Sequence, residues 1–309
     1  MTAPVSGAPL RFHIIGRGRM AATMRALTGD VDIDAAEAVY IASRNRDHGR
    51  QTRLALEAGK AVLCEKPCVM DPAEAAELIS LSQRTGRLYM EAVATPFLPA
   101  VATALDTAAS GRLGTLTHVE ASFGYRVGRA HHSRLFEADG GVLADRAIYP
   151  LMLALIALGP VRSMDCKVRR DGHGLDVAAR FRLDHLAGGT SDLAVSFVGR
   201  LDNSLRIDGT AGAVEVPPPL LTAQRIGFPR AARRPSQAWR SMRQNPLVRR
   251  LADLGARGTE RWRPFGDSPY AREVAHFTAL HRAGAIESPI VSHARMAEAA
   301  RLIAEARQA

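Results

Sequence analysis

Three side chains in this sequence have types suited to moving a proton at an oxygen atom: Lys66, Asp145 and Tyr149. Lys66 stands in the run 64–67, Cys-Glu-Lys-Pro, at the expected carboxyl end of a buried strand. Ligand sites of open parallel sheets lie at that edge, and an ammonium group there stabilises charge on a hydroxyl or carbonyl oxygen. A lysine on a surface loop is an equally good interpretation of this run taken alone.

Asp145 and Tyr149 follow a glycine-rich run that begins at Asp139. Four positions separate them, so at the start of a helix they share one face. A tyrosine phenol gives or takes a proton at a carbinol oxygen if a nearby ammonium group lowers its pKa, and Lys66 is the expected source of that group. An alternative stays open, in which Asp145 caps the helix and Tyr149 packs in the core.

A glycine turn near the amino terminus predicts a site for a phosphorylated ligand. The apolar run Phe12–Ile15 leads into Gly16-Arg17-Gly18, and a helix is expected from about Met20. Glycines in such a turn let the backbone approach a pyrophosphate, whose charge the N-terminus of the helix favours. The pattern is weak evidence alone, because a tight turn with close packing needs the same glycines.

The arrangement of these residues depends on two patterns along the chain. Up to residue 95, short apolar runs at 12–15, 38–42, 61–64 and 87–91 alternate with helical segments, which indicates a parallel sheet covered by helices. From residue 96, runs at 116–124, 161–169, 177–183, 189–197 and 204–208 alternate apolar and polar residues, and an apolar helix at 149–158 interrupts them. The sequence therefore predicts an α/β protein with an α+β second domain, 96–309, built on a large, mostly antiparallel open sheet.

The composition is that of a globular protein. Hydrophobic residues make up 47% of the 309, and no apolar run reaches the roughly 18–20 residues that span a bilayer. The first ten residues lack the basic and apolar regions of a signal peptide. Cys64, Cys68 and Cys166 form neither an even disulfide set nor a zinc-like cluster. We expect a cytoplasmic protein with no membrane segment and no metal.

The net charge of +10 is concentrated in one part of the chain. Eleven arginines and two acidic residues lie between Arg225 and Arg263. An Arg-rich insertion at about 229–263 could bind phosphate groups, but a solvated loop or helix face is the more common role of such a segment. No nucleic-acid partner is therefore expected.

Taken together, the elements resemble the Gfo/Idh/MocA family of NAD(P)-dependent oxidoreductases, and the resemblance spans nearly the whole chain. Its most specific motif is Glu-Lys-Pro at 65–67. The run 140–149 is similar to the family's glycine-rich run that ends in Asp-x-x-x-His or Asp-x-x-x-Tyr. The Tyr variant is similar to the branch of glucose–fructose oxidoreductase and dimeric dihydrodiol dehydrogenase.

The resemblance implies a role for each part of the chain. Residues 1–95 would form a truncated Rossmann-like dinucleotide-binding domain, and residues 96–309 a domain for the small-molecule substrate and for homo-oligomerisation through its sheet. Lys66 and Tyr149 would handle the proton, and Asp145 would position the substrate. The residues implied to contact the NAD(P) cofactor are Gly16, Gly18, Arg19, Met20, Ser43, Arg44, Asn45, His48 and Glu65.

The chain departs from the family between its first helix and its second strand. Only twelve residues, 28–39, lie there, where the family has a strand, a helix and another strand. The missing piece carries the residue that binds the adenosine ribose, and no full extra unit fits in so short a segment. Arg17, Arg44 and Arg46 are candidate replacements, and they favour the 2′-phosphate of NADP.

Three functions remain for comparison. The first is an NAD(P)-dependent oxidoreductase that transfers a hydride to or from a carbinol or carbonyl carbon of a sugar, cyclitol or cyclic diol. The second, suggested by the truncation, is a cofactor-independent acid–base enzyme such as an isomerase, cyclase or lyase. The third is a non-catalytic homologue whose basic segment contacts an acidic partner. Binding of a nicotinamide nucleotide distinguishes the first from the others.

Overall fold

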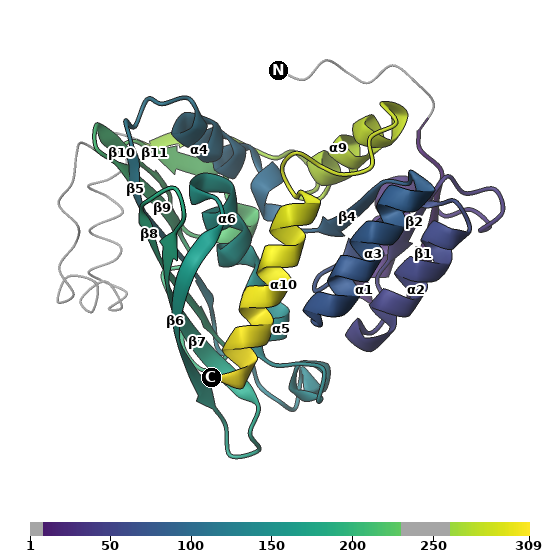
Figure 1. Ribbon diagram of the computed structural model, residues 1–309, viewed down its shortest axis with the longest axis horizontal. Coiled ribbons are helices and arrows are strands. Elements are labelled where there is room, and N and C mark those ends of the chain that lie inside the picture. The colour runs from purple at the N-terminus through teal and green to yellow at the C-terminus, as the bar shows by residue number, and fades with distance from the viewer. Residues whose placement is uncertain (1–8, 230–259) are drawn as a thin grey trace. The chain divides into compact units, whose positions relative to one another are not determined.

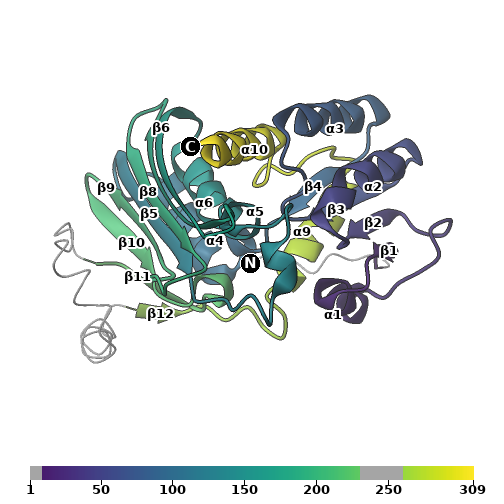
Figure 2. The same ribbon diagram turned by 90° about the horizontal axis from the view of Figure 1, so that it is seen from below.

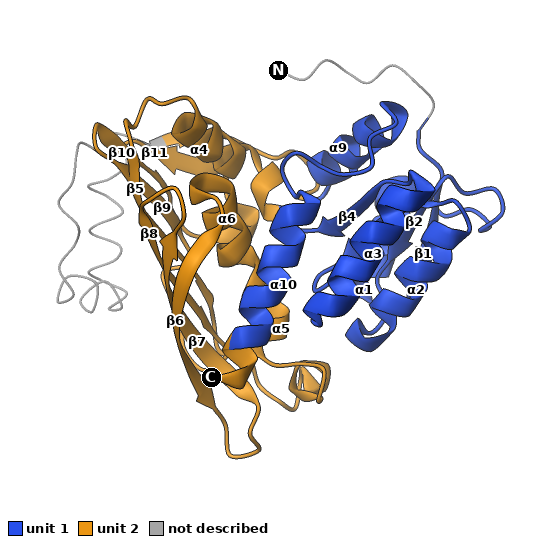
Figure 3. Cartoon of the chain, viewed as in Figure 1, with its two compact units in different colours: residues 1–94, 270–305 blue, residues 95–269, 306–309 orange. Residues whose placement is uncertain are grey.

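The chain folds around two different sheets, each the centre of its own unit (Figures 1 and 3). The computed structural model describes residues 9–229 and 260–309. Unit 1 comprises residues 1–94 and 270–305, and unit 2 comprises residues 95–269 and 306–309. No helix among the described residues is long and apolar enough to cross a membrane.

Unit 1 is built on a four-stranded parallel sheet with the strand order β1-β2-β3-β4. Its strands are β1 (Phe12–Ile15), β2 (Ala38–Ile41), β3 (Ala61–Glu65) and β4 (Tyr89–Ala92). Its helices are α1 (Arg19–Thr28), α2 (Asn45–Glu57), α3 (Pro72–Thr85), α9 (Ala271–Arg282) and most of α10 (His293–Gln308). The predicted parallel sheet is confirmed.

Local signals in the sequence account for the helix ends around this sheet. Helix α3 begins where the side chain of Asp71 accepts a hydrogen bond from the backbone N–H of Ala73 at 2.9 Å, with Pro72 in its first turn. It ends at Gly86, which adopts the left-handed conformation that suits a glycine C-cap. The strands β2 and β4 are buried along their whole length, as expected for a sheet covered on both faces.

One connection of this sheet runs differently from the others. Helices α2 and α3 cover one face of the sheet, whereas α1 lies on the opposite face (Figure 2). Since β1, β2 and β3 are parallel and follow one another in order, the crossover through α1 has the opposite hand to the crossovers through α2 and α3. Nearly all crossovers in proteins have one hand. The crossover through α1 contains the segment 28–39, where the resemblance implies a further strand, helix and strand.

The outer edge of β1 is covered by the short segment that replaces those elements. In the described part of the chain, β1 pairs with β2 alone. On its other side, Val31 N–H donates to Phe12 O at 3.0 Å, and Ile14 N–H donates to the Asp30 carboxylate at 3.0 Å. Arg25 donates to the carbonyl oxygens of Ile14 and Gly16 at 3.0 and 2.9 Å, and forms an ion pair with Asp30 at 2.7 Å. The side chains of Asp30 and Arg25 thus bind backbone N–H and C=O groups at the edge of β1 that would otherwise need a further strand as partner.

The carboxyl-terminal tail belongs mostly to unit 1, which corrects the expected assignment of residues 96–309 to a single domain. Phe277 of α9 packs on Phe12 of β1 with a ring-centroid distance of 5.8 Å. His293 Nε2, at the start of α10, lies 3.1 Å from the carbonyl oxygen of Tyr89 in β4, and Tyr89 N–H donates to Ile286 O at 3.1 Å. Helical periodicity shows that a face is buried but not which sheet buries it, so the sequence could not assign the tail.

Unit 2 is built on an eight-stranded sheet with the order β12-β11-β10-β9-β5-β8-β7-β6, antiparallel except between β5 and β8. Its strands are β5 (Leu116–Gly124), β6 (Val161–Arg170), β7 (Asp176–His185), β8 (Thr190–Ser196), β9 (Leu205–Gly209), β10 (Gly212–Val216), β11 (Arg225–Gly227) and β12 (Glu260–Trp262). Helices α4 (Pro99–Ala109), α5 (Val142–Arg146) and α6 (Ile148–Leu158) lie on one face (Figure 1). The predicted α+β sheet is confirmed, but the sequence analysis missed β10 to β12.

The Arg-rich insertion expected at about 229–263 lies largely outside the described residues, which omit 230–259. The strands on either side of that gap, β11 and β12, pair antiparallel, with Arg225 opposite Trp262. The insertion therefore connects neighbouring strands at one edge of the sheet of unit 2.

Replacing Asp30 with alanine tests the cover of β1. We expect Asp30→Ala to lower the free energy of unfolding by about 1–3 kcal/mol, because it leaves Ile14 N–H and Nε of Arg25 without their acceptor. Burial alone would raise the pKa of Asp30, but hydrogen bonds from Arg25 and Ile14 outweigh it and lower the pKa. The stability that ionised Asp30 contributes is therefore present above the unfolded-state pKa and is lost as the pH falls through the lower folded-state pKa. Urea denaturation at pH 7 and pH 3 measures both effects.

Asp34→Ala is the matched control, since Asp34 is an exposed residue of the same segment. Equal losses of stability in the two variants would contradict the role given to Asp30.

Candidate active site

Lys66 directly follows β3, at the carboxyl edge of the parallel sheet, as the sequence predicts. Three buried side chains hold the loop 65–68 that carries it. Tyr40 of β2 donates its hydroxyl to the carboxylate of Glu65 in a short hydrogen bond. His48 of α2 lies with Nδ1 at 2.8 Å from the carbonyl oxygen of Pro67. Cys68 N–H donates to Oε1 of Glu91 in β4 at 2.9 Å, so the loop is fixed from three elements.

His48, which contacts the loop at Pro67, is 1% exposed. A carbonyl oxygen accepts only, so Nδ1 of His48 carries the proton in its contact with Pro67. Burial lowers the pKa of His48, which keeps the ring neutral. The sequence analysis expected His48 beside the cofactor, and the structure gives it this second task of fixing the loop that follows Lys66.

Glu91 is a buried carboxyl group under the same loop. It is 3% exposed, and burial raises its pKa to about 7. Its hydrogen bond from Cys68 N–H opposes that rise, since such a bond favours the ionised form. The group is therefore close to half protonated at neutral pH. The sequence analysis did not single out this residue for the site, because a carboxylate inside a strand has no signal of its own.

A second buried carboxyl group, that of Glu273 in α9, is close enough to Glu65 to be affected by its charge. Glu273 is 1% exposed, and burial raises its pKa well above the ordinary value, with the negative charge of Glu65 adding to the effect. Burial likewise raises the pKa of Tyr40 well above its usual range, again with a contribution from Glu65. Tyr40 thus stays a hydrogen-bond donor to Glu65, whose carboxylate is held beside Lys66 N–H at 3.3 Å.

The glycine turn after β1 brings the backbone close to the end of β2. Gly16 has a φ of +135°, and a Cβ atom there would lie 2.3 Å from the carbonyl oxygen of Ala42. Only glycine fits this approach. Gly18 is the N-cap of α1, and no side chain in the described chain caps that helix or places an acid in its first turn. The turn and the helix N-terminus fit an anionic pyrophosphate.

The remaining expected cofactor residues lie along the same edge of unit 1. Arg19 and Met20 open α1, Arg44 is the N-cap of α2, and Asn45 begins that helix. Ser43 donates its hydroxyl to Gln51 Oε1 at 2.6 Å. Arg17, Arg44 and Arg46 are exposed. On the far side of β1, where an adenosine-binding strand would lie, the structure has Arg25 and Asp30 instead. The residues fit the pyrophosphate and nicotinamide half of the nucleotide better than the adenosine half.

Asp145 and Tyr149 lie in unit 2, on consecutive helices. Asp145 is in α5 and Tyr149 is in the first turn of α6, and Ala147 between them is also helical. The N-cap residues of the two helices are Gly141 and Ala147, and Asp145 lies inside α5, so Asp145 does not occupy the capping position that the alternative gave it. The ring of Tyr149 meets Phe123 of β5 edge-on, with centroids 5.5 Å apart, and both Asp145 and Tyr149 are partly exposed.

Asp176, which the sequence analysis missed, fixes the start of α5. Its carboxylate accepts a hydrogen bond from Leu143 N–H at 2.7 Å. Gly141, with a φ of +95°, leaves room for it, since a Cβ there would lie 2.5 Å from the Asp176 carboxylate. The two residues are 33 positions apart in the sequence, so no local pattern predicts their contact.

The described residues contain no group of three or more His, Cys, Asp or Glu side chains that could hold a metal ion.

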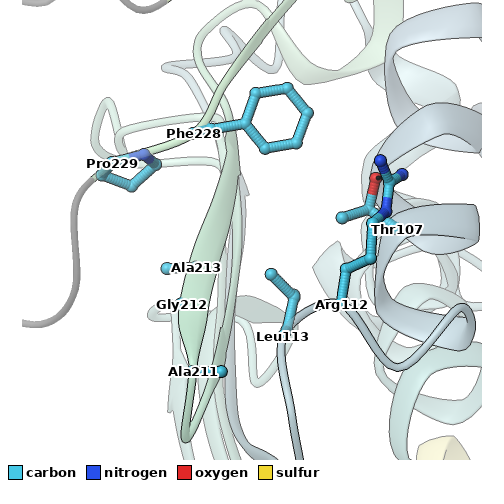
Figure 4. A pocket seen from close by; sticks show the side chains of 8 residues that line it. All are labelled: Thr107, Arg112, Leu113, Ala211, Gly212, Ala213, Phe228 and Pro229. Carbon is cyan, nitrogen blue, oxygen red and sulfur yellow. Dashed lines mark hydrogen bonds between the residues drawn. The ribbon is translucent and has the colours of Figure 1, made fainter.

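A hollow in unit 2 is lined by Arg112, Leu113, Phe228 and small residues of the β9–β10 turn and β10, with the hydroxyl of Thr107 at its edge (Figure 4). Arg112 Nη2 donates to that hydroxyl at 3.1 Å. The hollow contains none of the expected catalytic residues.

Comparison with known proteins assigns both parts of the chain to one family. A family model described as "Oxidoreductase family, NAD-binding Rossmann fold" matches residues 20–93. A second, described as "GFO/IDH/MocA C-terminal domain", matches residues 101–215.

The chain is also similar to individual proteins. Trans-1,2-dihydrobenzene-1,2-diol dehydrogenase of Bos taurus is 32% identical over 192 residues, which are 62% of this chain and 56% of that enzyme. The match thus spans a little over half of that relative.

Two solved structures share the fold over nearly their whole length. The aldose-aldose oxidoreductase from Caulobacter crescentus, complexed with glycerol, has a TM-score of 0.76 and 21% identity, covering 97% of this chain and 98% of that one. A 3-ketoreductase from Actinomadura kijaniata, in complex with NADP and TDP-benzene, has a TM-score of 0.74 and 20% identity with the same coverage.

Replacing Glu91 with glutamine tests the buried carboxyl group under the Lys66 loop. Its folded-state pKa is raised to about 7 from 4.5, so its contribution to stability is present below the unfolded-state pKa and is lost as the pH rises through 7. Glutamine keeps the acceptor for Cys68 N–H and does not ionise. We therefore expect the free energy of unfolding of Glu91→Gln, relative to that of the native chain, to rise by about 2 kcal/mol as the pH rises from 5 to 8.

Urea denaturation across that pH range makes the measurement. Glu57→Gln, at an exposed position of α2, is the control and should track the native chain. A difference between Glu91→Gln and the native chain that does not vary with pH would contradict the raised pKa.

Proposed function

Because the chain belongs to the Gfo/Idh/MocA oxidoreductase family, we propose that it is an NAD(P)-dependent dehydrogenase or reductase acting at a carbinol or carbonyl carbon. The observation that carries the proposal is the fixed loop of Lys66. Side chains from β2, α2 and β4 hold residues 65–68 by hydrogen bonds, although the nucleotide domain around them is shortened. A lysine that only lay on a surface loop would not need such support.

In the proposed reaction, Lys66 and Tyr149 handle the proton at the substrate oxygen. The Lys66 ammonium stabilises negative charge on that oxygen and lowers the pKa of a phenol beside it. Tyr149 gives or takes the proton. When bound, the nicotinamide supplies or accepts the hydride.

We propose a neutral polyol, a sugar, a cyclitol or a cyclic diol, as the substrate class. Asp145 is one helical turn before Tyr149 and 24% exposed, which suits a carboxylate that accepts a hydrogen bond from a neighbouring hydroxyl. The name of the bovine relative, a dehydrogenase of a cyclic trans-diol, supports the same class.

We propose NADP as the preferred nucleotide. Arg17, Arg44 and Arg46 are exposed around the glycine turn and the start of α2, and a guanidinium group binds a phosphate with two hydrogen bonds. No strand among the described residues lies beyond β1 to offer the acidic residue that binds the ribose of NAD.

A homo-oligomer formed through the sheet of unit 2 is part of the same proposal. Strand β7 alternates buried residues with the exposed Arg180, Arg182 and Asp184, so one face of the sheet is covered and the other is open. Such a face offers a second copy an interface with charged groups of both signs.

One observation favours a different function. The covered edge of β1 removes a part of the usual nucleotide site, and a chain that no longer binds nicotinamide could use Lys66 and Tyr149 for acid–base chemistry alone. Such an enzyme would be an isomerase, cyclase or lyase.

Titration of the charcoal-stripped protein with NADPH and NADH separates these functions. We expect saturable binding and a raised melting temperature, as linkage requires, with tighter binding of NADPH. Arg44→Met should weaken NADPH binding by about tenfold and leave NADH binding nearly unchanged, since it removes about 1.4 kcal/mol of charge-assisted binding to the 2′-phosphate. No binding of either nucleotide at millimolar concentration would overturn the redox proposal in favour of acid–base chemistry.

Replacing Lys66 with methionine tests its role in turnover. We expect Lys66→Met to lower kcat by about 10²–10⁴-fold, the usual contribution of a group that assists proton transfer, and to change nucleotide affinity by less than about threefold. Steady-state kinetics with NADPH and a cyclic ketone, together with the nucleotide titration, measure both. Lys167→Met, at an exposed position of β6, is the control. An equal fall of kcat in the two variants would remove Lys66 from the mechanism.

A further inference from the structure

Arg146, the last residue of α5, is a charged side chain enclosed in the core of unit 2. It is 0% exposed and the largest of the fully buried side chains in the described residues. Its guanidinium carbon lies 3.9 Å from the ring centroid of Tyr125, 4.5 Å from that of Phe197 and 5.1 Å from that of Phe123. Aromatic faces at these distances attract a cation, most strongly where water is excluded.

The guanidinium also connects two neighbouring strands in the interior of the sheet, β5 and β8. Its Nη1 donates to the carbonyl oxygen of Tyr125, the residue after β5, at 3.0 Å, and to that of Ser196, the last residue of β8. Strands β5 and β8 are the parallel pair, so these two carbonyls lie at the same end of the sheet. One side chain of α5 therefore fixes the helix against the ends of both strands.

A buried positive charge needs a negative partner, because burial of an unpaired charge costs several kcal/mol. In the part of the chain that the structure describes, the carboxylate in an ion pair with Arg146 is that of Asp145, with Nε 3.5 Å from Oδ2. Tyr125 is the other titratable group that acts on Arg146, Tyr149 stands in the first turn of α6, and Asp176 of β7 binds the start of α5. The remaining titratable residues of the strands packed on α5 are His118 and Glu120 of β5, Arg180, Arg182, Asp184 and His185 of β7, and Asp192 of β8. Burial lowers the pKa of Arg146, while Tyr125 and Asp145 oppose that shift, and a guanidinium stays protonated under these conditions.

The side chains of Asp145 and Arg146 differ in their exposure to solvent. The Asp145 side chain is 24% exposed, whereas that of Arg146 is fully enclosed. A substrate can therefore contact the carboxylate but not the guanidinium. The ring of Phe123 contacts both Arg146 and Tyr149, so the same guanidinium also supports the packing of the tyrosine.

We propose that Arg146 is a positioning residue that keeps Asp145 ionised and oriented as the acceptor for a substrate hydroxyl. The statement about the substrate rests on the proposed function, whereas the statement about the ion pair does not. An ionised Asp145 accepts hydrogen bonds from a neutral polyol and repels a substrate that carries a carboxylate of its own. Arg146 thus makes the site selective for uncharged hydroxyl compounds.

Removing the charge of Arg146 should shift the pH profile of the enzyme. The cation lowers the pKa of the neighbouring carboxyl group, so Arg146→Met raises it and moves the acid limb of kcat/KM to higher pH, by about one to two units. The loss should appear mainly in KM, since Asp145 binds the substrate rather than transferring the proton. Arg146→Lys keeps the charge and should leave the acid limb within about 0.3 units of the native one. An unmoved acid limb in Arg146→Met would overturn the proposal, because a residue that only packs the core does not set that limb.

A double-variant cycle with Asp145→Asn separates coupling from general damage. If Arg146 acts through Asp145, then Arg146→Met in the Asp145→Asn background should cost little further activity. Losses that multiply in the double variant would mean that Arg146 acts independently of Asp145, and would overturn the proposal. Should Arg146→Met fail to fold, Arg146→Gln replaces it in both experiments, since glutamine also removes the charge and keeps an N–H donor for the carbonyl oxygens of Tyr125 and Ser196. An unmoved acid limb in that variant would count equally against the proposal.

The pKa of Asp145 can also be measured without turnover. Carboxyl carbon resonances of ¹³C-labelled aspartate, assigned by comparison with Asp145→Asn, give the pKa in the native chain and in Arg146→Met or its substitute. A raised Asp145 pKa in a protein without redox activity would keep the ion pair and remove the proposed function. An unchanged Asp145 pKa in an active oxidoreductase would keep the function and remove this inference.

Discussion

The fixed position of one short loop is the constraint on which the rest of unit 1 depends. Residues 65–68 leave a buried strand and carry Lys66 at its carboxyl end. A loop at that place exposes backbone groups inside the protein, and each must find a partner. His48 satisfies the carbonyl oxygen of Pro67 and Glu91 satisfies the N–H of Cys68, so elements β4 and α2 are bound to β3 through the site. The contacts that position the Lys66 loop are therefore also contacts within the core of unit 1.

This constraint explains which part of the nucleotide domain could shorten. Strands β2, β3 and β4 and helix α2 supply every contact to the Lys66 loop described above, whereas β1 contributes only the glycine turn. Loss of the elements beyond β1 leaves the loop intact but exposes the outer edge of that strand. Arg25, Asp30 and Val31 satisfy that edge within one short segment, and α1 returns to the sheet by a crossover of the rarer hand. The contacts that hold the Lys66 loop are thus independent of the segment that covers the edge of β1.

The sequence predicts what depends on local pattern and misses what depends on distant contacts. Apolar runs of four or five residues and a glycine turn were sufficient to place β1, β2 and β3 and to put Lys66 at the end of β3. The spacing of Asp145 and Tyr149 gave their common helical context. Asp176, Glu91 and Glu273 were not singled out for the site, since a carboxyl group in a strand or helix has the same sequence signal whether it faces water or the core. The tail was assigned to the wrong sheet for the same reason, because α9 and α10 have apolar faces that either sheet could have buried.

Buried charge is distributed differently in the two units, and the difference follows from what each carries. In unit 1, Glu91 and Glu273 are carboxyl groups whose pKa values are raised by burial, which favours their neutral forms. In unit 2, the buried charge is the cation Arg146, and the group left partly exposed beside it is the carboxylate of Asp145. Burial therefore acts in opposite directions in the two units. It favours the neutral form of the carboxyl groups in unit 1, whereas in unit 2 an enclosed cation favours the ionised form of a carboxylate that stays within reach of solvent.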